Sequence, residues 1–173
     1  MRNDGVVDRR RVTITLWVSL VLVGLGLTWT FLGMRAVMDV GSTCADGGPY
    51  VSRQACPQGG LMVFPGIPLA LIAAFFGSSV APGLRAPDLL LPFWAAIFLS
   101  LGWNFWEYGL RNGEALLAWV VCGALFWALA APAVYLLFKR TRERIEERRW
   151  WPTYAGLTVL GVRLGAVSFS AVT

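Results

Sequence analysis

The stretch 12-VTITLWVSLVLVGLGLTWTFLGM-34 decides the class of fold, because it holds 23 residues without a charged side chain. A helix of about 20 apolar residues crosses the ~30 Å hydrocarbon core of a bilayer. Three further apolar stretches of similar length follow at 61–80, 89–108 and 116–138. The sequence therefore predicts an all-α polytopic membrane protein, an antiparallel bundle of four transmembrane helices.

The composition agrees with a chain that is mostly embedded in a bilayer. Charged residues make up 14% of the 173 residues, against about 25% in a soluble domain. We predict an N-terminal tail at 1–11, a transmembrane domain at 12–138 and a cytoplasmic extension at 139–173. The extension begins with a basic helix that continues from the fourth span to Arg149 and stops at Pro152. No room remains for a large soluble catalytic domain.

The distribution of basic residues predicts the orientation of the helices. Of the 15 Lys and Arg residues, twelve lie in the segments 1–11 and 139–173 or at Arg85 between the second and third spans. Basic segments stay in the cytoplasm during insertion. We therefore predict a multi-pass protein of the bacterial inner (plasma) membrane with both termini in the cytoplasm. The net charge of +5 indicates contact with the headgroups of the lipid bilayer rather than with nucleic acid.

The segment Thr153–Thr173 leaves two interpretations open. Arg163 stands in its middle, and a central Arg costs about 2.5–3.5 kcal/mol on insertion. Its glycines also weaken a helix. We expect a segment that lies on the membrane surface or is poorly ordered. The alternative is a fifth crossing, which would place the C-terminus outside.

Two cysteines occupy the first outward connection. Cys44 and Cys56 lie on the side of the membrane where disulfides persist, and we predict a bond between them. In the chain-entropy model a bridge over a loop of this size contributes about 3 kcal/mol. Redox chemistry is the alternative, but no Cys-x-x-Cys motif is present. Cys122 falls within the fourth span and is expected to be a packing residue.

A polar stripe marks the third span. Ser100, Asn104, Glu107 and Arg111 are spaced 4, 3 and 4 residues apart, so they share one helix face. Glu107 and Arg111 have the i, i+4 spacing of an ion pair, and Thr30 on the first helix falls at a similar depth. Ionisable residues at membrane depth point to function. A structural pair and a site for a ligand, ion or partner both remain open.

The first span carries a second pattern, of small residues. Ser19, Gly26 and Gly33 are seven residues apart and therefore lie on one face. Small faces allow membrane helices to approach closely. We expect this face to pack within the bundle, with a homodimer contact as the alternative.

Several kinds of chemistry find no support in the sequence. The chain has no His, so His-ligated haem, His metal sites and Ser-His-Asp catalysis are excluded. A Gly-rich phosphate loop and internal repeats are also absent, and the latter argues against an inverted-repeat transporter. We predict no metal, no cofactor and no catalytic residues.

One resemblance involves both the outward loop and the third span. The loop reads Cys44-x-x-Gly-Gly-Pro-Tyr, followed by Cys56-Pro, and the third span holds LGWNFWEYG at 101–109. Over residues 12–140 this resembles uncharacterised four-helix membrane proteins of actinobacteria. The resemblance implies their topology and an outward disulfide loop, but no activity. The general plan is also similar to that of claudin-like proteins, whose Gly-Leu-Trp signature this chain lacks.

Three functions follow as hypotheses. The first is a small membrane scaffold or accessory subunit that binds another membrane protein, or a further copy of itself, without catalysis. The second is a transporter or channel subunit in which the polar stripe lines a path. The third is a lipid-modifying enzyme with Glu107 as acid or base, although no partner group supports it.

Overall fold

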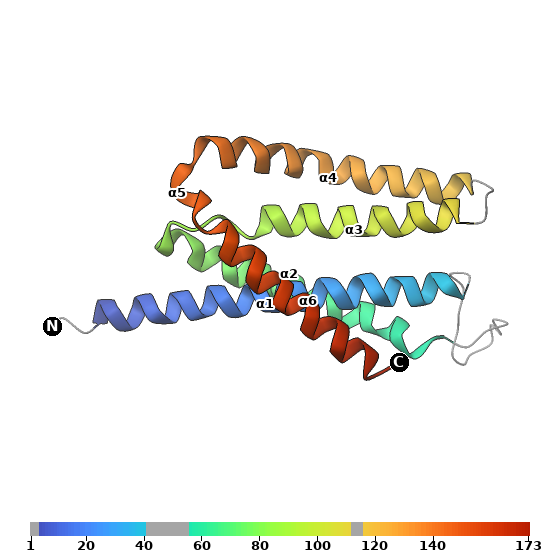
Figure 1. The fold of residues 1–173 in the computed structure, drawn as a ribbon, viewed down its shortest axis with the longest axis horizontal. Coiled ribbons are helices and arrows are strands. Elements are labelled where there is room, and N and C mark those ends of the chain that lie inside the picture. Colours follow the sequence, from blue (N-terminus) through green and yellow to red (C-terminus); the bar gives the residue numbers. More distant parts are fainter. Residues whose placement is uncertain (1–3, 41–55, 112–115) are drawn as a thin grey trace.

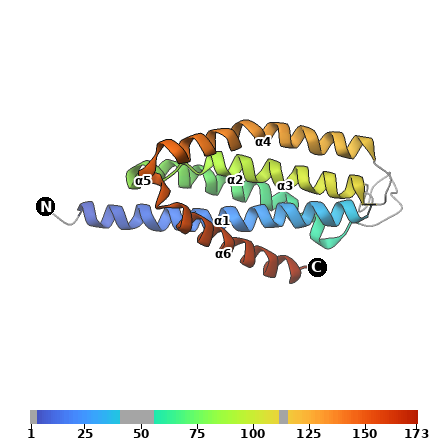
Figure 2. The ribbon, with the colours of Figure 1, turned by 45° about the horizontal axis from the view of Figure 1, so that its top comes forward.

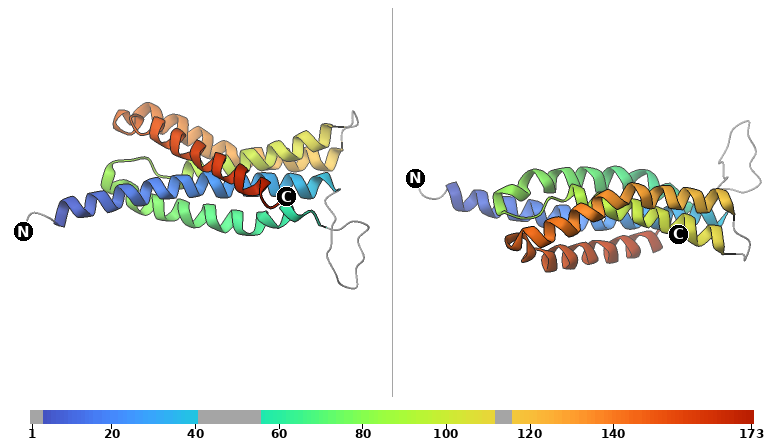
Figure 3. Two further views of the ribbon diagram at one scale, coloured as in Figure 1. Left: turned by 60° about the horizontal axis from the view of Figure 1, so that its bottom comes forward. Right: turned by 90° about the horizontal axis from the view of Figure 1, so that it is seen from above.

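The computed structural model describes residues 4–40, 56–111 and 116–173, and in these ranges it contains helices and no strand (Figure 1). Four of the long helices lie roughly along one axis (Figure 3), and the C-terminal helix is inclined to them (Figure 1). The elements are α1 (Asp4–Asp39), the short 3-10 helix η1 (Gln58–Met62), α2 (Val63–Val80), the 3-10 helix η2 (Ala81–Leu84), α3 (Leu90–Leu110), α4 (Leu117–Glu143), α5 (Ile145–Arg148) and α6 (Trp151–Ser170).

Within the described residues, three stretches are long and apolar enough to cross a membrane: Asp8–Asp39, Gln58–Leu84 and Leu117–Glu143. They contain three of the four predicted spans, and the class of membrane protein follows from them. The helices α3 and α6 have 21 and 20 residues. Both are long enough to cross, but α3 carries Asn104 and Glu107 and α6 carries Arg163.

The predicted small face of α1 packs against α2. A Cβ added at Gly26 would lie 2.6 Å from the carbonyl oxygen of Gly66 in α2, closer than two such atoms can come. The two backbones are therefore in direct contact, as small residues permit in membranes. All three predicted residues face the stretch formed by η1 and α2: Ser19 lies against Gly77, Gly26 against Gly66 and Ala70, and Gly33 against Gly59 and Val63.

A different side of α1 packs against α6. A Cβ at Gly161 would lie 2.1 Å from the carbonyl oxygen of Val21, and one at Gly165 would lie 3.0 Å from that of Leu25. Gly161 and Gly165 form a Gly-x-x-x-Gly pattern, which favours close helix contact in membranes. The same glycines that weaken a helix in water thus fix the position of α6.

The C-terminal segment is not the poorly ordered tail that we allowed for, and its place on or across the membrane stays a prediction. It is a continuous helix, and Pro152 stands in its first turn, where proline is favoured, rather than stopping the helix before it. Because Gly161 contacts Val21 and Ser168 accepts a hydrogen bond from Trp29 Nε1 at 2.8 Å, α6 runs in the same direction as α1, and it crosses α1 obliquely (Figures 1 and 2). The predicted four-helix bundle is therefore incomplete, since α6 is a fifth long helix within it.

The two ends of the helix assembly differ in charge. We call the end where α1 begins and α4 stops the basic end, because it holds Arg9–Arg11, Arg85 and the 139–149 region. The opposite end, where α1 stops and η1 begins, is the loop end. Phe169 and Thr173 lie against Gly59, so α6 finishes at the loop end. The start of α1 and residue 173 are thus at opposite ends of the assembly.

The hairpin of α3 and α4 is held by two matching Gly-x-x-x-Trp patterns. Trp127 of α4 covers Gly102 of α3, and Trp106 of α3 covers Gly123 of α4. The two indole rings stack with centroids 4.7 Å apart. Each tryptophan fills the space that the glycine of the other helix leaves open, which sets the antiparallel register of the pair.

We expect Gly161→Ala to lower the free energy of unfolding by about 1–3 kcal/mol, because the added methyl group forces α1 and α6 apart. Gly156→Ala is the matched control on the same helix, since a Cβ there meets nothing within 4 Å. The control should be neutral or slightly stabilising. Unfolding in mixed detergent micelles measures both variants, and an equal loss in the two would contradict the α1–α6 contact.

Candidate functional site

The polar stripe of α3 meets α1 at the loop end. Arg35 of α1 donates two hydrogen bonds to Glu107, from Nη1 to Oε2 at 2.8 Å and from Nη2 to Oε1 at 2.6 Å. The two side chains are 27% and 31% exposed. A fork of this kind fixes the orientation as well as the distance of the two groups. It therefore joins α1 to α3.

The predicted pairing of Glu107 with Arg111 is wrong. Arg111 instead donates to Asp39 Oδ1 at 2.9 Å, and its guanidinium lies 4.7 Å from the ring centre of Tyr108. The Tyr108 hydroxyl donates to the same Asp39 oxygen. Glu107 pairs with Arg35 of α1 rather than with its i, i+4 neighbour Arg111, because Arg35 donates two parallel N–H groups to the Glu107 carboxylate. Each acid and base of this cluster thus has a partner on the other helix.

Asn104 is the most buried residue of the polar stripe. Its side chain is fully buried, and Nδ2 donates to the carbonyl oxygen of Phe31 at 3.3 Å. Its Oδ1 has no hydrogen-bond partner in the part of the chain that the structure describes. A buried acceptor without a donor costs about 1–3 kcal/mol. Asn104 thus links α3 to α1 through one atom and leaves another open.

The remaining predicted site residues lie elsewhere. Ser100 donates to the carbonyl oxygen of Ile97 in its own helix at 2.9 Å, and Thr30 donates to that of Gly26 at 2.8 Å. Thr30 also lies against Gly66 of α2, so it does not join the stripe. The predicted set is therefore not one site: Asn104, Glu107 and Arg111 reach α1, whereas Ser100 and Thr30 do not take part.

The predicted disulfide concerns a region that is only partly described. Cys44 lies outside the described residues, so the Cys44–Cys56 bond stays a prediction. Cys122 is exposed on α4, and not buried as expected of a packing residue.

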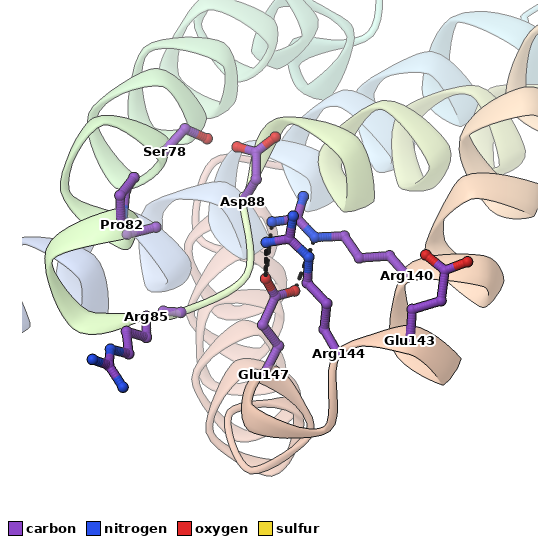
Figure 4. Close-up of a pocket in the computed structure, with 10 residues that line it drawn as sticks. Ser78, Pro82, Arg85, Asp88, Arg140, Glu143, Arg144 and Glu147 are labelled. Carbon is purple, nitrogen blue, oxygen red and sulfur yellow. Dashed lines mark hydrogen bonds and ion pairs between the residues drawn. The ribbon is translucent and has the colours of Figure 1, made fainter.

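A second polar cluster lies at the basic end and was missed from the sequence. A cavity of about 610 Å³ separates the end of α2 and η2 from the end of α4 and α5 (Figure 4). Arg140 and Arg144 extend into it toward Glu147, whereas the guanidinium of Arg85 points away from this group (Figure 4). The other lining residues are Ser78, Ala81, Pro82, Ala86, Asp88 and Glu143.

Glu147 holds the two arginines of this cavity together. Arg140 donates to its carboxylate from Nε at 2.9 Å and from Nη2 at 3.0 Å, and Arg144 donates from Nη1 at 2.9 Å. The Glu147 side chain is only 9% exposed. Burial opposes ionisation, but the hydrogen bonds from both arginines outweigh it and hold the pKa of Glu147 below its usual value.

A break in the helix creates this cluster. We expected one continuous basic helix to Arg149, but α4 ends at Glu143 and Arg144 has non-helical angles, φ −110° and ψ 83°. The chain turns there, and Glu147 comes back toward Arg140. Pro152 is favoured in the first turn of a new helix, so it indicates that the preceding helix ends before residue 151, but it does not locate the break at Arg144.

The chemistry available to these clusters is ion pairing and hydrogen bonding. Each guanidinium has five N–H donors, and Glu147 takes two from Arg140 and one from Arg144, so donors remain for an oxyanion. Among the residues that can be described, no group of three or more metal-ligating side chains is present. Neither cluster places an acid and a nucleophile around an open space at membrane depth.

Known proteins provide no further guide. No protein-family model, curated protein or solved structure matches this chain. The resemblance to the actinobacterial proteins therefore stays a prediction, and the function must be argued from the contacts above.

Replacing Glu107 tests the link between α1 and α3. We expect Glu107→Gln to lower the free energy of unfolding by about 1 kcal/mol, because the pair is partly exposed. Arg35→Gln should cost a similar amount, and the double variant little more than either single one. Arg142→Gln, near the end of α4 at the basic end, is the control for the same change of residue type, and its effect should add independently to that of Glu107→Gln. Additive losses for Arg35 and Glu107 would contradict the pairing.

Proposed function

We propose that this protein is a non-catalytic integral membrane subunit that binds another membrane protein. The observation that carries the proposal is that the charged side chains between α1 and α3 pair with one another. Arg35, Glu107, Asp39 and Arg111 are committed to one another in the contact between α1 and α3. A catalytic acid or base at this depth would need to be available to a substrate. Their mutual pairing supports a structural role.

The exposed surface supports the same proposal. The membrane-spanning stretch in α4 is the least buried of the three long apolar stretches. Large aliphatic side chains such as Leu117, Leu125 and Leu129 are more than half exposed on it. Lipid or a partner helix can cover such a surface. The exposed apolar surface of α4 therefore supports binding to another membrane protein, whereas no comparable observation supports catalysis.

We further propose five membrane crossings, with the basic end in the cytoplasm. The concentration of Arg and Lys at this end supports its location. Because α6 runs parallel to α1, residue 173 would then lie on the outer side. This replaces our expectation that both termini are cytoplasmic, which assumed four crossings and a tail on the inner surface.

A transport role is the second candidate, and Asn104 is the observation that favours it. Its buried Oδ1 could receive a hydrogen bond from a bound molecule or from water. Asn104→Leu separates the two functions. Loss of flux with intact assembly would favour transport, and unchanged partner binding without any flux in the native protein would favour the subunit.

The proposed function predicts a stable complex. Purification from the native membrane in mild detergent, followed by native mass spectrometry, should recover a second membrane protein at fixed stoichiometry. The control is a sample in which α6 is displaced by Gly161→Leu. Recovery of the chain alone, or only as a homo-oligomer, would contradict the proposal.

A further inference from the structure

Arg163 stands on the side of α6 that faces away from the rest of the protein. Gly161 and Gly165 lie against α1 and are buried, whereas Val162, Arg163 and Leu164 between them are exposed. Among the residues that the structure describes, no carboxylate pairs with Arg163. Its guanidinium therefore has five N–H donors and a positive charge that no carboxylate of the described ranges pairs with.

The contacts of α6 fix the depth of Arg163. Gly161 lies beside Val21, and Gly165 lies beside Leu25 and Thr28. Arg163 is thus level with the middle of the apolar stretch 12–34. In a bilayer crossed by α1, this position is far from both headgroup layers. A basic side chain at this depth almost always faces a protein interior, a water-filled cavity or an acidic partner.

The surface around Arg163 has the shape of a helix-packing face. Gly156, Arg163 and Ser170 are seven residues apart, and Val159 and Val167 flank Arg163. All five are exposed. A Cβ at Gly156 would meet nothing within 4 Å, so the backbone of α6 is open there to a close neighbour. We call Gly156, Val159, Arg163 and Val167 the Arg163 face.

We propose that the Arg163 face binds a transmembrane helix of a different protein that carries an Asp or Glu near the middle of the bilayer. The inference rests on the proposed function and names the chemistry of its partner. The carboxylate would pair with Arg163, and the valines and the open glycine would pack against the same helix. Ion pairing of this kind is strong in hydrocarbon because water does not compete for either charge.

A second copy of this chain does not fit the Arg163 face. Within the described spans, the membrane-depth acid is Glu107, which is held by Arg35 at the loop end and is not level with Arg163. A two-fold contact through this face would also bring two Arg163 side chains together, and like charges repel strongly at low dielectric. Lipid phosphate is the other source of negative charge, but it lies at the bilayer surface.

Photo-crosslinking in the native membrane tests the proposal. A photoreactive p-benzoylphenylalanine replaces Val159 or Val167, and the same residue at Ile72, an exposed apolar position of α2, is the control. We expect positions 159 and 167 to capture one protein, and position 72 to capture little of it. Peptide mass spectrometry should place the captured site in a transmembrane helix with a central Asp or Glu.

Variants of Arg163 then test the ion pair itself. Arg163→Leu should reduce the crosslink yield about tenfold or more, whereas Arg163→Lys should retain most of it. Arg163→Leu should leave the amount of protein in the membrane and its melting temperature unchanged or higher, because it removes an unpaired charge. This readout separates loss of the partner from loss of the fold.

The outcomes distinguish this inference from the proposed function. A partner that is captured equally well with Arg163→Leu, or whose helix lacks an acid, overturns the inference and leaves the proposed function in place. Adducts with lipid alone, or with a second copy, also overturn it. If the native protein yields no partner by crosslinking or by purification, both proposals fail.

Discussion

Close contact between the backbone of α1 and its two neighbours is the constraint on which the other contacts depend. In a bilayer, lipid tails are as apolar as Leu, so helices associate through van der Waals packing and hydrogen bonds. α1 meets α2 at Gly26 and α6 at Gly24, where an added Cβ would lie 2.4 Å from the carbonyl oxygen of Thr158. Gly26 and Gly24 therefore lie on two separate sides of one helix, and neither position has space for a Cβ atom.

The ion pairs at the two ends of the assembly determine which helices lie next to one another there. Arg35 and Glu107 fix α3 beside α1 at the loop end, and Glu147 gathers Arg140 and Arg144 where α4 turns toward α6. The partly exposed loop-end pair contributes about 1 kcal/mol at most. The insertion of an unpaired central Arg costs about 2.5–3.5 kcal/mol. If α6 crosses the membrane as proposed, the free energy associated with Arg163 is the larger of the two, and a contact that pairs its charge would offset it.

Much of the fold could be predicted from local sequence properties. Runs of apolar residues located the helices α1 to α4, and the seven-residue spacing of Ser19, Gly26 and Gly33 identified the face that meets α2. These features predict the helices correctly because bilayer thickness and helix periodicity constrain each segment independently of the others. The helical order of α6 and its packing against α1 were not expected, for a reason of the same kind. Taken alone, Arg163 disfavours membrane insertion and the glycines weaken a helix. Gly161 and Gly165 become favourable only because they allow close contact with α1.

The candidate site was less predictable, because its partners are distant in sequence. The i, i+4 rule assigned Glu107 to Arg111, yet Arg35 lies 72 residues away and forms the stronger fork. Similarly, the basic run at 139–149 fits a solvated helix until the break at Arg144 brings Glu147 to Arg140. The sequence identifies which residues are charged, whereas the order of helices in space decides how they pair.

The location of residue 173 tests the central claim, that α6 crosses the membrane beside α1. Single cysteines introduced as Asp8→Cys and Ala171→Cys, in a chain whose own cysteines are replaced by Ser, can be labelled in intact cells with a membrane-impermeant maleimide. The account predicts labelling at 171 without permeabilisation, and labelling at 8 only after it. Protection of both positions until the cells are opened would place α6 on the inner surface and contradict the account.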